Sequence, residues 1–272
     1  MQQLFTTAKD GTRLAYRVDG EAAPGGAPRP VILVQHGLGF RGEAWGAWLP
    51  ALLGAGFRVI RPDWRGHGAS GPMPAGQAWS TDQMLDDMET VLEAEGVGPC
   101  HLLGESWGGT MSLALASRLG QRVRSLAVVS TAYDGTAIVN ARNFARDIRA
   151  KGLAAWAAEV SVNRSHGNEA LRAWSEDSTR NSDEGSMISI CEYIVAETIE
   201  QRLAGIVAPT LIMAPFASHF VSMDLARMLS ARVALNEIAW FPGHTHGLVL
   251  SGGALAANTL LNFIRRHTGE PS

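Results

Sequence analysis

The stretch Gly104-Glu105-Ser106-Trp107-Gly108-Gly109 decides how this chain folds. It follows an apolar run at residues 100–103 and precedes a small-residue segment at 111–119, so a buried strand turns here directly into a helix. The glycines allow a turn so tight that the serine backbone is strained and its hydroxyl is lifted above the sheet edge. This context is the one that a G-x-S-x-G motif requires, whereas a chance Gly/Ser turn would lack it. The stretch therefore predicts an activated serine at Ser106.

Short apolar runs alternate with amphipathic segments along most of the chain. Such alternation is typical of a mostly parallel sheet that helices cover on both faces. A helix is expected to begin at Thr81, because Ser80 and Gln83 form a capping box ahead of apolar residues at helical spacing. The apolar runs predict an α/β fold with an eight-stranded sheet, with strands at residues 4–7, 13–18, 31–35, 57–61, 100–103, 123–130, 209–214 and 234–240.

One long segment, residues 135–205, breaks the alternation. It has no convincing strand and reads instead as short helical blocks, at 138–151, 153–161 and 187–197. We expect residues 1–134 and 206–272 to form the core, and 135–205 to form a helical cap inserted after the sixth strand. A cap in that place would cover the carboxyl ends of the strands, where ligands bind in open α/β folds.

Composition and charge restrict the classes of partner. The 272 residues are 46% apolar, which suits one α/β domain with an insertion, and the net charge of -3 offers no basic field for nucleic acid or an anionic membrane. Cys100 and Cys191 fall in apolar segments and read as buried thiols of a reducing compartment. We expect no signal peptide and no membrane-spanning segment, because the sequence offers neither a basic patch before an apolar core nor a bilayer-length apolar stretch. The expectation is a cytoplasmic protein with a small-molecule substrate, with homo-oligomerisation left open.

Two further stretches complement the serine. His36-Gly37-Leu38-Gly39 closes the strand at 31–35, and the backbone N–H groups of Leu38 and Trp107 would be the donors that stabilise an oxyanion. Taken alone, His-Gly also fits an ordinary strand-ending turn. After the last strand, His244 and His246 are candidates for the base that exchanges the serine proton. A His-x-His metal site is the competing interpretation, but no Cys or acidic cluster completes it, so we expect neither a metal nor a cofactor.

These features resemble the α/β-hydrolase superfamily, and the resemblance extends over essentially the whole chain. It rests on the loop at His36, the elbow at Ser106, the helical cap, the C-terminal histidine and residues 62–70, a stretch that is usually structural in such proteins. The resemblance therefore implies no catalytic role for Asp63 or His67 within that stretch.

The resemblance also selects between the two histidines. These hydrolases usually place a large apolar residue of the last helix at a fixed distance after the catalytic histidine. Phe263 stands at that distance from His246, whereas His244 would pair with Leu261. The implied base is His246.

The family pattern fails at one position. Relatives usually carry Gly-x-x-Asp after the strand at 209–214, and here Ser218 stands where the aspartate is expected. Without a carboxylate the imidazole loses the group that orients it and stabilises its cationic form. Some members place the acid after the preceding strand, where Asp134 is the only carboxylate, so we name Asp134 as the third member; a solvated Asp in a turn fits equally. Asp224 is a weaker candidate, because it sits where a helix N-terminus attracts an acid anyway.

The cap resembles that of 3-oxoadipate enol-lactonases and small carboxylesterases in its arginines. Arg142, Arg146 and Arg149 recur at helical spacing and could offer charge to a substrate carboxylate, although such a stripe is also typical of a solvated face. The expected function is a cofactor-independent serine hydrolase that cleaves a small carboxylic ester, lactone or related acyl compound through an acyl-enzyme. The alternatives are a non-hydrolytic enzyme on the same scaffold (carbon–carbon lyase, acyltransferase or cofactor-free dioxygenase) and a catalytically idle binding module.

Overall fold

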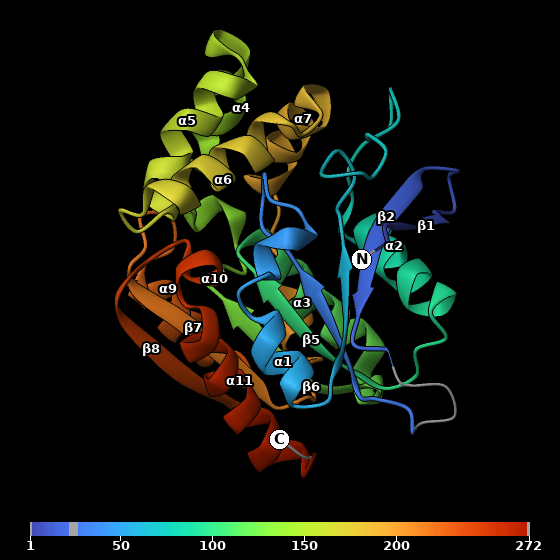
Figure 1. Cartoon of the computed structure of the whole chain (residues 1–272). Helices are drawn as coiled ribbons and strands as arrows, with labels where there is room; N and C mark the ends of the chain where they lie inside the picture. The colour runs from blue at the N-terminus through green and yellow to red at the C-terminus, as the bar shows by residue number, and fades with distance from the viewer. Residues whose placement is uncertain (1, 22–26, 271–272) are drawn as a thin grey trace.

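A computed structural model describes residues 2–21 and 27–270 of the chain. Its centre is an eight-stranded sheet in the order β1-β2-β4-β3-β5-β6-β7-β8 (Figure 1). The pairs β1–β2 and β2–β4 are antiparallel and all other neighbours are parallel. The predicted α/β-hydrolase fold is confirmed, and its parallel strands bring their carboxyl ends to one edge.

The strands lie close to the predicted runs. They are β1 (Leu4–Thr7), β2 (Arg13–Asp19), β3 (Val31–Gln35), β4 (Arg58–Pro62), β5 (Cys100–Glu105), β6 (Val123–Val129), β7 (Thr210–Ala217) and β8 (Asn236–Thr245). The last two run further than expected, because they continue to pair with each other up to Ala217 opposite Thr245. This extension carries the chain up to the sheet edge just before residues 218 and 246.

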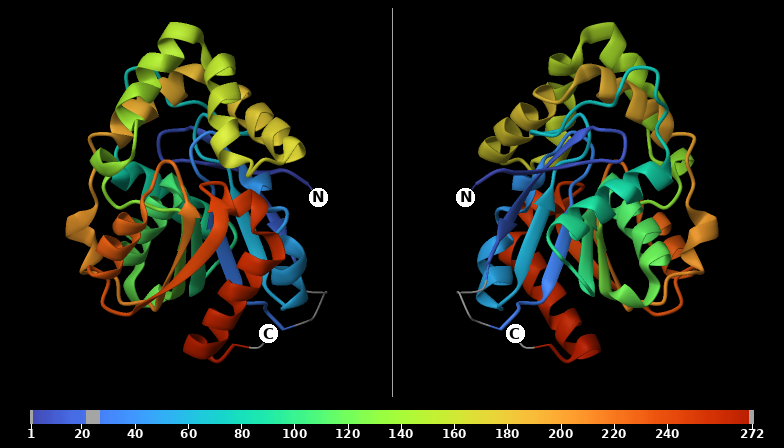
Figure 2. Two further views of the ribbon diagram at one scale, coloured as in Figure 1. Left: turned by 90° about the vertical axis from the view of Figure 1, so that its left-hand side faces the viewer. Right: turned by 90° about the vertical axis from the view of Figure 1, so that its right-hand side faces the viewer.

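Helices cover both faces of the sheet, as Figure 2 shows from two sides. On one face α2 (Thr81–Ala94) and α3 (Trp107–Leu119) pack on side chains such as Leu33, and on the other α1 (Leu49–Gly54) and α11 (Gly253–Thr268) pack on side chains such as Ile32. All five residues of β3 are buried, as expected for a strand covered on both sides. The shorter elements are α9 (Met223–Ser230), α10 (Leu248–Ser251) and the 3-10 turns Gly42–Trp45, Gly120–Arg122 and Gly135–Ala137.

Four helices between β6 and β7 stand over the carboxyl edge of the sheet (Figures 1 and 2). They are α4 (Ala141–Lys151), α5 (Leu153–Arg164), α6 (Glu169–Arg180) and α7 (Glu184–Ile194); the short α8 (Glu200–Leu203) follows them. We refer to α4–α7 as the cap helices. The sequence did not predict α6, because its buried residues are the small polar Ser175, Ser178 and Thr179, while the apolar Leu171 and Trp174 are only partly buried.

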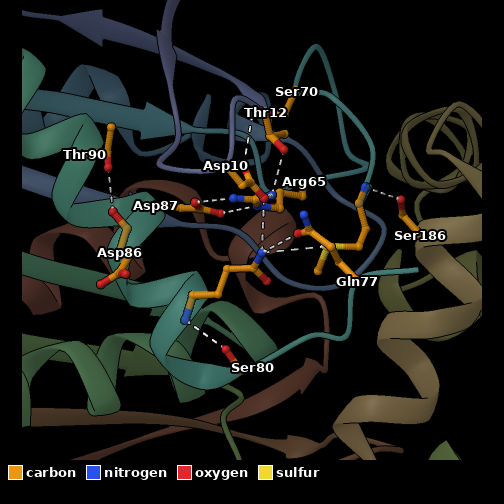
Figure 3. A network of polar contacts seen from close by, with 12 residues as sticks. Asp10, Thr12, Arg65, Ser70, Gln77, Ser80, Asp86, Asp87, Thr90 and Ser186 are labelled. Carbon is orange, nitrogen blue, oxygen red and sulfur yellow. Dashed lines mark hydrogen bonds and ion pairs between the residues drawn. The ribbon is translucent and has the colours of Figure 1, made fainter. Parts of the chain in front are cut away.

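A buried arginine ties the loop after β4 to its surroundings (Figure 3). Arg65 forms a two-pronged ion pair with Asp87 of α2, at 2.6 and 2.8 Å, and a third bond to Asp10 at 2.5 Å. The hydrogen bond from Arg65 lowers the pKa of Asp10 to about 2. On the cap side of the same loop, Ser186 of α7 accepts a hydrogen bond from the Met73 backbone N–H at 2.9 Å. The loop after β4 thus anchors the cap helices to the core.

Two properties of the whole chain bear on the earlier expectations. Cys100 and Cys191 are both free and buried, as predicted. Among the residues that the structure describes, no helix has both the length and the apolar character needed to cross a bilayer.

Candidate active site

Ser106 lies at the junction of β5 and α3, in the predicted strand-to-helix turn. Its φ of +52° is in the region that L-residues rarely adopt, so the backbone is strained there. A Cβ at Gly104 would lie 2.4 Å from the Gly108 carbonyl oxygen, and a Cβ at Gly108 would lie 2.4 Å from the carbonyl oxygens of Gln35 and His36. The two glycines are therefore required by close backbone packing around the serine.

His246 directly follows β8, and its ring lies beside Ser106 at the carboxyl edge of the sheet. Its Nε2 lies 3.0 Å from the Ser106 hydroxyl, although the two residues are 140 positions apart in the chain. The ring is 3% exposed and meets the Phe220 ring edge to face at 4.9 Å. Burial, with a smaller contribution from Arg164, lowers the pKa of His246 to about 3, so the ring is neutral at physiological pH. His244 instead stacks on His166 and has Nδ1 3.0 Å from the Ser251 hydroxyl.

The second nitrogen of His246 meets a hydroxyl and not a carboxylate. Nδ1 lies 3.0 Å from Oγ of Ser218, the residue directly after β7. The same oxygen accepts a hydrogen bond from the Val221 backbone N–H at 3.1 Å. A serine oxygen has two lone pairs, so it can accept from Val221 and from an Nδ1–H at once. In that arrangement Nε2 carries the free lone pair that faces Ser106.

The predicted acid, Asp134, is not brought to the histidine. Its Oδ1 accepts hydrogen bonds from the Thr136 backbone N–H at 2.9 Å and the Thr136 hydroxyl at 2.7 Å, so the carboxylate caps the turn that leads into the cap. This corrects the sequence-based choice: the turn alternative describes Asp134, and Ser218 occupies the place facing Nδ1. Asp224 is exposed at the start of α9 and pairs with Arg227 at 2.8 Å.

The two predicted oxyanion donors flank the serine. Trp107 is the first residue of α3, so its N–H has no acceptor within the helix, and Leu38 follows the end of β3; both line the same pocket as Ser106 and His246. The nearby ring of His36 is buried, with Nε2 accepting the Trp64 backbone N–H at 3.0 Å. His36 therefore supports the loop that carries Leu38.

His67 and Asp63, for which no catalytic role was expected, likewise hold backbone. His67 Nε2 accepts the Gly39 N–H at 3.0 Å, and Asp63 accepts the N–H groups of Gly42 and Ala69 at 2.7 and 3.0 Å. These contacts fix the loops beside the site, which is a structural task.

Comparison with known proteins agrees with this geometry. The family model for the alpha/beta hydrolase fold matches residues 30–197, more than half of the chain. The chain belongs to the α/β-hydrolase family. It is an enzyme of the hydrolase type.

Individual relatives have varied names. A protein of Variovorax paradoxus, named "Putative carbamate hydrolase RutD", is 29% identical over 93% of this chain and 96% of its own length. The bifunctional epoxide hydrolase 2 of Sus scrofa is 30% identical, but over only 47% of this chain and 22% of its own length. The solved enol-lactonase of Burkholderia xenovorans superposes with a TM-score of 0.85, at 24% identity, over 96% of this chain and 99% of its own, and this likeness concerns the fold alone.

Two ionisable residues of this hydrolase, Glu105 and Arg164, received no role from the sequence. Glu105, directly before the serine, is 1% exposed, and its Oε1 lies 3.7 Å from His246 Nε2. Burial raises the pKa of Glu105 to about 8, against a smaller opposing effect of Arg164. Arg164, the last residue of α5, is 6% exposed and lines the pocket above Ser106. The sequence of α5, which also carries the charged Glu159, gave no signal that singled out Arg164, whereas Glu105 stood inside the motif itself.

The three arginines predicted for substrate binding lie elsewhere. Arg142, Arg146 and Arg149 are exposed on α4, where Arg146 pairs with Asp147 at 2.9 Å and Arg149 with Glu192 at 2.5 Å. They form the solvated face that was the alternative interpretation. The pocket is lined mainly by apolar side chains, among them Leu38, Ile138, Phe144, Ile194 and Phe220. Within residues 2–21 and 27–270, no three His, Cys, Asp or Glu residues gather as a metal site would require.

Proposed function

We propose that this hydrolase cleaves small carboxylic esters, lactones or related acyl compounds through an acyl-enzyme on Ser106. The observation that carries the proposal is the continuous chain from the Ser106 hydroxyl to His246 Nε2 and from Nδ1 to Ser218, each link 3.0 Å long. A strained serine within hydrogen-bond reach of a buried neutral imidazole is the arrangement that activates a hydroxyl as a nucleophile.

The reaction follows from these positions. Ser106 Oγ attacks the acyl carbon while His246 Nε2 accepts its proton, and the N–H groups of Leu38 and Trp107 hold the oxygen that becomes negative. His246 then gives the proton to the leaving group, which departs as the alcohol and leaves the acyl-enzyme. In the second half His246 deprotonates a water molecule, the water releases the acid, and Ser106 regains its proton.

Ser218 performs half of the task that an aspartate has in this family. By accepting the Nδ1–H it fixes the tautomer that leaves Nε2 free for the serine proton. A neutral hydroxyl supplies no charge to stabilise the imidazolium that forms in each step, so we expect slower turnover than a carboxylate would give. Asp134 has no direct part in this mechanism.

The comparisons support hydrolysis of an acyl compound over hydrolysis of an epoxide. The relative that matches over nearly its whole length carries the name of a carbamate hydrolase, and a carbamate is an acyl derivative. Epoxide hydrolases of this scaffold need an aspartate where Ser106 stands. We further propose that residues 135–205 act as a lid and that the enzyme is cytoplasmic, which suits the free thiols of Cys100 and Cys191.

A fluorophosphonate probe tests the nucleophile directly. We expect the probe to label wild-type protein on the peptide that contains Ser106, as mapped by mass spectrometry, and p-nitrophenyl acetate to be hydrolysed. The Ser106→Ala variant, with an unchanged melting temperature, should lose both. Absence of labelling at high probe concentration would reject the serine mechanism. The protein would then be a binding module or an enzyme that forms no serine ester, two alternatives that the lack of an aspartate at position 218 keeps open.

A further inference from the structure

Glu105 places a buried carboxyl on the Nε2 side of the catalytic histidine. It is the last residue of β5, is 1% exposed, and has Oε1 3.7 Å from His246 Nε2. A glutamate is almost never buried to this extent unless a positive charge or several hydrogen-bond donors accompany it. The groups around Glu105 therefore decide which charge it carries and when.

The protein gives this carboxyl space but few partners. A Cβ at Gly37 would lie 2.1 Å from Glu105 Oε2, so the glycine of the loop after β3 leaves room for the carboxyl. Within residues 2–21 and 27–270, Oε2 has no hydrogen-bond partner of ordinary geometry. Burial raises the pKa of Glu105 to about 8, against smaller opposing effects of Arg164 and of the Gly37 backbone N–H. The carboxyl is therefore mostly protonated at pH 7 and mostly ionised at pH 9.

The other titratable groups around this carboxyl keep one charge state over that range. Burial lowers the pKa of three histidine rings, from the loops after β3 and β4 and from the end of β8, to between about 3 and about 4, so they are neutral: His36, His67 and His246. Burial raises the pKa of the Cys191 thiol of α7 to about 12, and the guanidinium of Arg164 in α5 keeps its proton. Between pH 7 and pH 9, the charge beside Ser106 therefore changes through Glu105.

The imidazolium that forms during turnover needs a negative charge that the Nδ1 side does not supply. Ser218 is a neutral hydroxyl, and Arg164 lowers the pKa of His246 further, because a second positive charge in the buried site is unfavourable. A base with so low a pKa accepts the serine proton poorly, and its efficiency rises as its pKa approaches the working pH. A carboxylate 3.7 Å from Nε2 would stabilise the imidazolium strongly, because water screens the two charges poorly there.

We propose that ionised Glu105 supplies the negative charge that position 218 lacks, so that the enzyme passes from a slow to a fast form when this carboxyl releases its proton to water. In the fast form the carboxylate stabilises the imidazolium that forms when Nε2 takes the Ser106 proton. That proton still passes from His246 to the leaving group, so Glu105 acts through His246 and transfers no proton itself. The inference rests on the proposed function for its reaction, but the effect of Glu105 on the ring can be measured without turnover.

The kinetic test follows kcat for p-nitrophenyl acetate from pH 7 to pH 9, corrected for spontaneous hydrolysis. Wild-type kcat should rise at least about fivefold with a midpoint near pH 8, while KM changes little, because the carboxylate acts on the imidazolium and not on substrate binding. In Glu105→Gln the ratio of kcat at pH 9 to kcat at pH 7 should be close to one.

Two control variants should keep the rise. Glu169→Gln removes an exposed carboxylate of α6 that is bonded to Arg172, and His219→Gln removes an exposed ring whose charge also bears on His246. A level wild-type profile, or a rise in Glu105→Gln equal to that of wild type, would overturn the proposal.

A spectroscopic test separates this inference from the reaction. In protein labelled with 15N-histidine, the His246 Nε2 resonance, assigned by its absence from His246→Ala, should shift with a midpoint near pH 8 in wild type and in Ser106→Ala, but not in Glu105→Gln. If the fluorophosphonate probe fails to label Ser106 but this titration is seen, the reaction is wrong and the effect of Glu105 on the ring stands. If the probe labels Ser106 and wild type shows no titration near pH 8, the role of Glu105 is rejected, even should Glu105→Gln fail to fold.

Discussion

The two sides of the His246 ring are built by different means. On the Nε2 side, Ser106 is held by a strained turn whose flanking positions must be glycine, because a Cβ at Gly104 or Gly108 would lie 2.4 Å from a neighbouring carbonyl oxygen. On the Nδ1 side, Ser218 stands after the end of β7, where a side chain meets the ring at 3.0 Å. Backbone sterics permit one kind of sequence at the elbow, whereas the strand end accepts different side chains without a change of fold. A sequence motif therefore identifies Ser106, whereas no motif identifies the residue that faces Nδ1.

Removing the ring breaks both sides at once and should have the largest effect. We expect His246→Ala to lower kcat for p-nitrophenyl acetate by at least about 10³, because the serine then has no group to accept its proton. The measurement is steady-state hydrolysis with circular dichroism as a check of folding. A loss smaller than tenfold in folded protein would mean that another group is the base.

A carboxylate placed at position 218 should make the Nδ1 side contribute more to catalysis than the present hydroxyl does. We expect Ser218→Asp to raise kcat by about 10- to 100-fold, because a charge then stabilises the imidazolium, part of the roughly 10⁴ lost when a triad aspartate is neutralised in serine proteases. Ser218→Ala is the matched control and should lower kcat by about tenfold through loss of the tautomer anchor. If both variants match wild type, Ser218 does not act on the histidine.

The pH dependence of the wild-type enzyme tests whether His246 is a neutral base without a carboxylate at Nδ1. Burial lowers the pKa of His246 from 6.5 to about 3, so the base stays neutral and kcat/KM should remain level from pH 7 down to about pH 5, a range in which Glu105, whose pKa burial raises to about 8, also stays mostly protonated. The stability contributed by this neutral ring is present above pH 6.5 and is lost as the pH falls toward 3, because the unfolded chain binds the proton first. Ser218→Asp should move the acid limb to higher pH. A wild-type limb near pH 6.5 in folded protein would contradict the buried neutral ring.

The smallest effect is expected at the carboxylate that lies apart from both sides. Asp134→Asn should change kcat/KM by less than about twofold, because the amide oxygen can still accept the Thr136 N–H and no contact with His246 is altered. Its cost in stability should stay below about 1 kcal/mol, as for a retained cap. Urea unfolding and ester hydrolysis measure both quantities. A tenfold loss of activity would return Asp134 to the catalytic group.

The sequence predicted what depends on periodicity or on backbone geometry. The eight strands, the capping box, in which Ser80 accepts the Gln83 N–H at 3.1 Å, and the turn at Ser106 all follow from local patterns. The helix α6 escaped prediction because its apolar contacts are few. Arg164 escaped because helical spacing drew attention to arginines on an exposed face, while a single buried charge leaves no periodic pattern.

The missing acid shows the limit of a resemblance. The resemblance indicated that position 218 lacks the usual aspartate, and Asp134 was the carboxylate predicted to replace it. The structure has Ser218 itself against Nδ1, and the nearest carboxyl to the ring, Glu105 at 3.7 Å from Nε2, lies on the opposite side. Which side chains meet across strand ends depends on tertiary register, and local patterns do not record it.

Gly247, the residue after His246, determines how closely the end of α5 can approach the catalytic histidine. A Cβ there would lie 1.8 Å from the carbonyl oxygen of Arg164, so the end of α5 rests directly on the backbone that carries the histidine. One helix terminus thus both presents a guanidinium to the pocket and braces the general base. Any side chain at position 247 would push this terminus away from the backbone that carries His246, so the seating of the cap and the position of the base depend on the same glycine.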